Sequence, residues 1–290
     1  MGSQVMSETV LSVRSAEQTR TRALVVPREH GAWGLLFVPL FTGAAVGIAS
    51  SSRLWPILLF SLAALALSWL RTPVESLLGT TSLSAQTAEE RRIALQASVG
   101  LASLSATCLA GLLWNGRNPD LLLLGGVAAV AFVAQTVLKK LSRKLRMAAQ
   151  IVGAIGLTCT APAAYYLATG RLDRIAWLLW VANWIFAGDQ IHFVQLRIHA
   201  ARAATFAEKF ARGRAFFLAQ LFLVPALLLA AIRGLMPPLV LLAFLPALAR
   251  GFAWFLRRQQ PLQVRSLGWS EMRQGILFGV LLAATIIASA

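Results

Sequence analysis

The feature that most constrains the fold is a series of apolar segments, each close to the length that a helix needs to cross a bilayer. About 20 apolar residues span roughly 30 Å of hydrocarbon. Hydrophobic residues make up 58% of the chain and charged residues 13%, which excludes an ordinary soluble domain. We therefore predict an all-α, polytopic integral membrane helix bundle of about nine transmembrane helices. The predicted ranges are 31–51, 54–78, 93–114, 120–139, 147–169, 174–198, 214–233, 236–256 and 271–290.

The 27 Lys and Arg residues predict how this bundle is oriented. Most of them lie in the N-terminal tail and in the connections that follow the even-numbered segments, and cytoplasmic loops carry such an excess. We therefore expect a bacterial inner membrane protein with its N-terminus in the cytoplasm and its C-terminus outside. Because the cations surround apolar segments and do not gather in a polar domain, membrane lipids are the expected partners and nucleic acid is not. The connections on the opposite side hold Arg53, Arg117, Arg171, Arg174 and Arg233.

The domain organisation is predicted to be simple. Residues 1–27 are polar and lack the apolar core of a signal peptide, so we expect a disordered cytoplasmic tail. Residues 28–290 are expected to form a single transmembrane domain. In the first segment Gly43 and Gly47 are spaced as a small-xxx-small face, which allows another helix to approach closely.

Ionisable residues gather at the start of the first segment, where Arg28, Glu29 and His30 precede Trp33. Unpaired charges are costly in hydrocarbon, so these side chains should lie at the water boundary. One interpretation is a topological anchor, with Trp33 at the level of the headgroups. The other is a polar cluster at the entrance to a site.

Asp189 is the carboxylate placed most deeply in an apolar segment, and an ionisable residue at that depth is a candidate functional residue. His192 follows at i+3, and Gln195, Arg197 and His199 continue the same polar stripe. The stripe is typical either of an Asp–His pair buried for packing specificity or of a substrate or ion site. Both interpretations remain open from the sequence.

Other charges are expected on the same cytoplasmic side. Arg71 and Glu75 are spaced as an i,i+4 pair, which is usually a solvated salt bridge. Lys139 begins a basic stretch that reaches residue 146 and would attract anionic lipid or contact a lipid phosphate. The chain has no Walker loop, dinucleotide fingerprint, His-Glu-x-x-His or Gly-x-Ser-x-Gly motif, which argues against ATP-driven transport, hydride transfer and zinc proteolysis.

Two stretches resemble the YwiC-like family of bacterial membrane proteins. The first is Val-Pro-Arg-Glu-His-Gly-Ala-Trp at 26–33, continuing to Pro39 and Gly43, and it looks like the opening signature of that family. The second is Phe-Val-Gln-Leu-Arg-Ile at 193–198, which is similar to the family's aromatic-Val-x-x-x-Ile stretch. The resemblance implies a membrane protein and supplies no reaction.

The expected architecture also resembles the UbiA superfamily of intramembrane prenyltransferases, through helix count, orientation and the pattern of Arg28, Pro39 and Gly43. That resemblance implies two aspartate-rich motifs that hold Mg²⁺ against a prenyl diphosphate. Here each motif is reduced to one carboxylate, Glu75 and Asp189. Three outcomes are compatible with this reduction. The pair could share one Mg²⁺, arginine could neutralise the phosphate without metal, or only a lipid-binding cavity could remain.

The leading hypothesis is a divergent prenyltransferase-like protein that binds an isoprenoid or lipid (di)phosphate at the cytoplasmic side. Whether it is an enzyme stays open. The alternatives are a transporter or exporter with an Asp189–His192 relay, and a non-catalytic lipid-binding protein. In the leading hypothesis the candidate catalytic residues are Asp189, His192, Glu75 and His30, the candidate Mg²⁺ ligands are Asp189 and Glu75, and the candidate substrate-binding residues are Arg28, Glu29, Arg71, Lys139 and Arg197.

Overall fold

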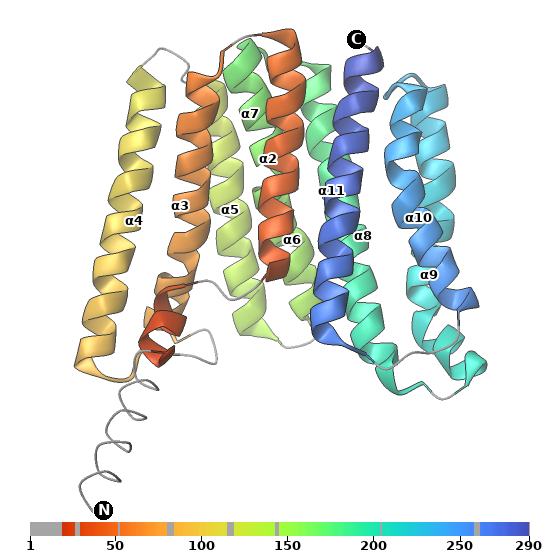
Figure 1. The fold of residues 1–290 in the computed structure, drawn as a ribbon, viewed down its shortest axis with the longest axis horizontal. Coiled ribbons are helices and arrows are strands. Elements are labelled where there is room, and N and C mark those ends of the chain that lie inside the picture. Colours follow the sequence, from red (N-terminus) through yellow and green to blue (C-terminus); the bar gives the residue numbers. More distant parts are fainter. Residues whose placement is uncertain are drawn as a thin grey trace, which may run out of the picture. The chain divides into compact units, whose positions relative to one another are not determined.

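The computed structural model describes residues 19–26, 30–51, 53–79, 84–114, 119–142, 145–203, 205–257 and 262–289. Within these ranges every regular element is a helix, which confirms the predicted all-α class (Figure 1). The chain divides into two compact units. Unit 1 comprises residues 1–30 and 58–116, and unit 2 comprises residues 31–57 and 117–290.

Unit 1 contains a short helix at residues 19–25, most of α3 (Trp55–Leu77), and α4 (Ala88–Trp114). The first turn of α4 is fixed by a capping box, in which the Glu90 amide donates to Thr87 Oγ1 and Glu90 Oε2 accepts from the Thr87 amide. Glu90 also accepts from Arg20 Nε at 2.6 Å, and Trp69 Nε1 donates to the Val25 carbonyl at 2.8 Å. Polar contacts therefore hold the short helix to α3 and α4. Residues 1–18 of the predicted tail lie outside the described residues.

Unit 2 contains the remaining helices, and aromatic rings join several of them within its largely aliphatic core. Phe186 stacks on Phe278 with 4.0 Å between ring centroids, and Phe244 meets Phe278 edge to face at 5.2 Å. These rings join α8, α10 and α11, so that polar groups between the same helices are shielded from the surroundings. The elements of unit 2 are α2 (His30–Ser50), α5 (Pro119–Leu141), α6 (Arg146–Thr158), α7 (Thr160–Thr169), α8 (Arg174–His199), η2 (Ala200–Arg202), α9 (Phe206–Ile232), η3 (Pro238–Val240), α10 (Leu241–Leu256) and α11 (Val264–Ser289).

The end of α7 and the start of α8 show how local sequence sets the helix boundaries. Gly170 ends α7 in a left-handed conformation with φ of 76°, which glycine adopts without steric cost. Asp173 then caps α8 by accepting from the amides of Ile175 and Ala176. This tight turn places the start of α8 beside the end of α7.

Helices occupy each of the predicted ranges, although several begin earlier than the apolar pattern indicates. Within the described part of the chain, seven helical segments are long and apolar enough to cross a membrane, counting Arg146–Thr169 as one segment. The shorter apolar stretch Gly34–Ser50 lies in α2, and the polar residues of α8 keep that helix outside the seven. A polytopic helical membrane protein is thus supported. The count of nine spans and the UbiA-like architecture remain predictions.

Candidate functional site

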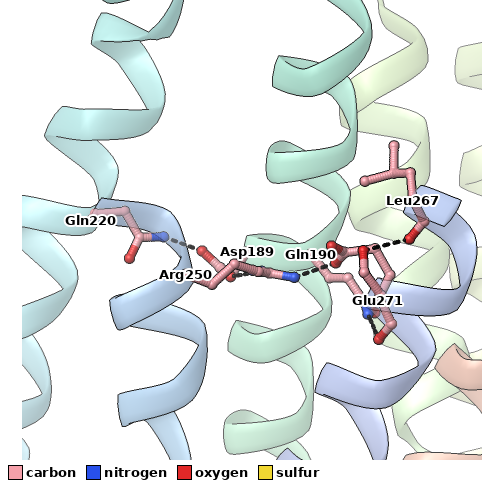
Figure 2. A network of polar contacts seen from close by, with 7 residues as sticks. Asp189, Gln190, Gln220, Arg250, Leu267 and Glu271 are labelled. Atoms are coloured by element: carbon pink, nitrogen blue, oxygen red, sulfur yellow. Dashed lines mark hydrogen bonds and ion pairs between the residues drawn. The ribbon is translucent and has the colours of Figure 1, made fainter. Parts of the chain in front are cut away.

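Three buried charged side chains form an ionic network between helices of unit 2. Arg250 of α10 lies between Asp189 of α8 and Glu271 of α11 (Figure 2). Its Nη2 is 2.8 Å from Asp189 Oδ2, and its Nη1 donates to Glu271 Oε2. The side chains of Asp189, Glu271 and Arg250 are only 5%, 9% and 12% exposed. One guanidinium therefore balances two carboxylates away from solvent.

Neighbouring side chains fix the orientation of this network. Gln220 Nε2 of α9 donates to Asp189 Oδ1, and Gln190 Nε2 donates to the Glu271 carbonyl at 2.7 Å. The Arg250 guanidinium also lies over the Phe193 ring, with 4.2 Å from its central carbon to the ring centroid. The network thus joins α8, α9, α10 and α11 (Figure 2).

A cavity of about 510 Å³ lies beside the network, and Arg250 lines it. Its walls come from the end of α8 with η2, from α10 and the residues just after it, and from the first turns of α11. The wall combines three arginines and two uncharged polar side chains with apolar and aromatic residues. The lining residues are Phe193, Arg197, Ala201, Pro246, Ala249, Arg250, Ala253, Trp254, Arg257, Leu262, Ser270 and Gln274.

Lys209 of α9 adds a further positive charge near this cavity. It is 4% exposed, its Nζ donates to the carbonyls of Trp254 and Arg257 at 2.5 Å, and it lies 4.5 Å from the Trp254 ring centroid. Lys209 thereby caps the carbonyl end of α10. With Arg197, Arg250 and Arg257 it opposes only the two carboxylates of the network. The described groups around the cavity therefore leave an excess of two positive charges.

Several buried polar atoms here have no hydrogen-bond partner within the described part of the chain. They are Arg250 Nε, Glu271 Oε1, Gln220 Oε1 and Gln274 Oε1. Buried polar atoms in native proteins are nearly always paired with protein, water or a ligand. Arg250 and Gln274 line the cavity, and Gln220 and Glu271 belong to the adjacent network, so the network and the cavity together form the candidate functional site.

The structure places two of the predicted residues of the polar stripe at this site. Asp189 belongs to the network, and Arg197 lines the cavity. His192 is half-buried and meets Phe216 edge to face with 5.1 Å between ring centroids. The described bonds of the Asp189 carboxylate go to Gln220 and Arg250 rather than to His192.

Among the described residues, the network and the cavity lining include none of the remaining predicted site residues. Glu75 belongs to unit 1, where it accepts from Arg71 Nε at 2.9 Å as the i,i+4 spacing predicts. Lys139 is exposed near the end of α5. Arg28 and Glu29 lie outside the described residues, as does the side chain of His30. Among the residues that the structure describes, no group of three or more His, Cys, Asp or Glu is placed to hold a metal ion, and the Mg²⁺ site of Glu75 and Asp189 stays a prediction.

Sequence reasoning missed Arg250 and Glu271. Glu271 was the first residue of the last predicted segment and resembled an ordinary polar boundary. Arg250, however, lies inside the apolar range 236–256, and an arginine within a membrane segment normally has a buried partner. That rule could have indicated Arg250 as the partner of Asp189.

Comparisons with known proteins bear on the N-terminal half of the chain. No curated protein and no solved structure matches the chain. One family model matches the chain, and its match ends at residue 165. The network, the cavity and the stretch at 193–198 all follow that residue in the sequence. Residues 26–165 match the family model described as YwiC-like protein, which supports the resemblance that the opening signature predicts.

Proposed function

We propose that this YwiC-like membrane protein binds the phosphate-bearing head of an isoprenoid or another lipid in the cavity between α8, α10 and α11. The observation that carries the proposal is the cavity wall, where Arg197, Arg250 and Arg257 stand beside apolar side chains. Guanidinium groups match phosphate oxygens in a planar, bidentate geometry. The site therefore suits an amphiphile with an anionic head.

The charge balance supports phosphate as the anion. Two carboxylates already engage Arg250, so Arg197 and Arg257 are the cavity cations with capacity for a ligand. An excess of two positive charges matches the dianion of a phosphate monoester. The attraction between these guanidinium groups and a phosphate is stronger here than in water, because the cavity lies against buried side chains of low polarity.

The apolar part of the wall supports an amphiphile over a small ion. Phe193, Pro246, Trp254 and Leu262 provide a surface on which the first carbons of a lipid chain can lie. Prenyl transfer with Mg²⁺ would require the metal to compete for Asp189 with Arg250 and Gln220. Charge neutralisation by arginine needs no such competition, so we favour phosphate binding without a metal.

Binding of hexadecyl phosphate to the purified protein in nanodiscs tests the proposal. We expect Arg197→Gln and Arg257→Gln each to weaken binding about tenfold or more, because each removes a charge-assisted hydrogen bond. Hexadecanol, which lacks the phosphate, should not compete. Arg171→Gln is the matched control, because Arg171 is an exposed residue between α7 and α8. Equal binding by the control and the two cavity variants would refute the assignment.

A transporter is a second candidate, favoured by the position of the Asp189–Arg250–Glu271 network inside a membrane helix bundle. Buried ionisable residues of this kind often mark substrate or ion pathways. Proteoliposomes loaded with labelled glycerol 3-phosphate distinguish the two functions. If the protein is a transporter, proteoliposomes that contain the wild-type protein release the label faster than those that contain Arg250→Met. If it only binds the ligand, the two release the label at the same rate.

A further inference from the structure

The wall that α11 contributes to the cavity presents acceptors. Gln274 lines the cavity, and its Oε1 is buried without a partner. Ser270, one turn earlier, already donates its hydroxyl hydrogen to the Leu267 carbonyl at 2.8 Å. Glu271 Oε1, on the same helix but outside the cavity lining, is a second buried oxygen without a donor among the described residues. Two buried acceptors of α11 therefore have no donor among the described residues.

A phosphate group alone does not satisfy these oxygens. Its own oxygens are acceptors when ionised, so they belong beside Arg197 and Arg257, and a second part of the ligand must face Gln274. An ammonium group would supply donors, but the positive excess around the cavity opposes it. A neutral hydroxyl supplies a donor without that repulsion.

Resting on the proposed phosphate binding, we infer that the natural ligand is a hydroxylated phosphate monoester amphiphile. Its phosphate contacts Arg197 and Arg257, and a hydroxyl on a carbon near the phosphate donates to Gln274 Oε1. The hydroxyl thereby satisfies a buried acceptor that a simple alkyl or prenyl phosphate leaves unpaired. Gln274 is on this basis the residue that sets specificity for the head of the lipid.

Two ligands that differ in a hydroxyl test the inference. The first is 1-palmitoylglycerol 3-phosphate, which carries a free hydroxyl near its phosphate monoester, and the second is hexadecyl phosphate, which has none. We expect the protein to prefer the first about five- to tenfold, the range set by one net hydrogen bond to a buried acceptor. Gln274→Leu should abolish that preference while hexadecyl phosphate still binds. Gln263→Leu is the matched control, because Gln263 is exposed just before α11.

Each outcome decides a separate point. Equal affinity of the wild-type protein for the two lipids overturns the inference and leaves phosphate binding intact. A preference that survives in Gln274→Leu overturns the assignment to Gln274. Failure of both lipids to bind overturns the proposed function itself. Free glycerol 3-phosphate is the third ligand, and its binding as tightly as the lipid would show that the site takes a soluble phosphate and not an amphiphile.

Discussion

At the scale of single residues, Arg250 decides whether the interior of unit 2 can hold its charges. Its guanidinium is the cation bonded to both Asp189 and Glu271. We expect Arg250→Met to lower the free energy of unfolding by about 3–5 kcal/mol, because two buried carboxylates would lose their partner. Chemical unfolding in detergent micelles, followed by tryptophan fluorescence, measures the change.

The control for this prediction removes all three charges together. Arg250→Met combined with Asp189→Asn and Glu271→Gln should recover most of the lost stability, since no uncompensated carboxylate remains. Arg233→Met, at an exposed position after α9, should change stability by no more than about 0.5 kcal/mol. An Arg250→Met protein as stable as the wild type would show that the carboxylates do not depend on this guanidinium.

The residues of the candidate site were only partly predictable from the sequence. Asp189 and Arg197 stand out because ionisable groups are rare in apolar segments, and both lie at the site. Their partners depend on which helix faces which, and a single-segment pattern carries no such information. For that reason the sequence did not indicate Arg250 on α10 as the ionic partner of Asp189, and the Mg²⁺ site that the UbiA resemblance implies for Asp189 and Glu75 stays a prediction.

At the scale of helices, α2 approaches α7 so closely that a side chain cannot be added. A Cβ built on Gly43 would lie 2.0 Å from the carbonyl oxygen of Ala161, and one on Gly47 would lie 2.7 Å from Ala168 Cβ. We expect Gly43→Ala to lower the free energy of unfolding by about 1–3 kcal/mol, because the two backbones must separate. The measurement is the same unfolding experiment in micelles.

Gly125→Ala on α5 is the matched control for the glycine prediction. A Cβ at Gly125 would meet no atom within 4 Å, and alanine favours a helix more than glycine does. This variant should therefore be as stable as the wild type or slightly more stable. If Gly43→Ala and Gly125→Ala behaved alike, the close packing of α2 on α7 would be contradicted.

The apolar pattern predicted where helices lie better than it predicted where they begin. Helix α4 begins at Ala88 and α9 at Phe206, in both cases before the apolar range. The reason is capping: Thr87 pairs with Glu90, and Thr205 Oγ1 accepts from the Glu208 amide. These polar first turns extend each helix beyond its hydrocarbon-length stretch, which hydropathy alone does not detect.

At the scale of the whole molecule, the membrane orientation depends on whether α8 crosses the bilayer. Its polar residues keep it outside the seven apolar spans, yet its length of 26 residues is sufficient to cross. The Lys and Arg distribution predicts that residue 171, before α8, lies outside and that residue 206, after it, lies in the cytoplasm. The two flanking positions therefore test the crossing directly.

Single cysteines at these positions provide the measurement. We expect a membrane-impermeant maleimide to label Arg171→Cys in intact cells, and to label Phe206→Cys only after the membrane is permeabilised, since both residues are exposed. Native Cys108 and Cys159 are buried and can be replaced by alanine to remove background. Labelling of both positions from the same side would mean that α8 does not cross. The Asp189–Arg250–Glu271 network would then not lie within a crossing helix, and the transporter alternative would lose the observation that favours it.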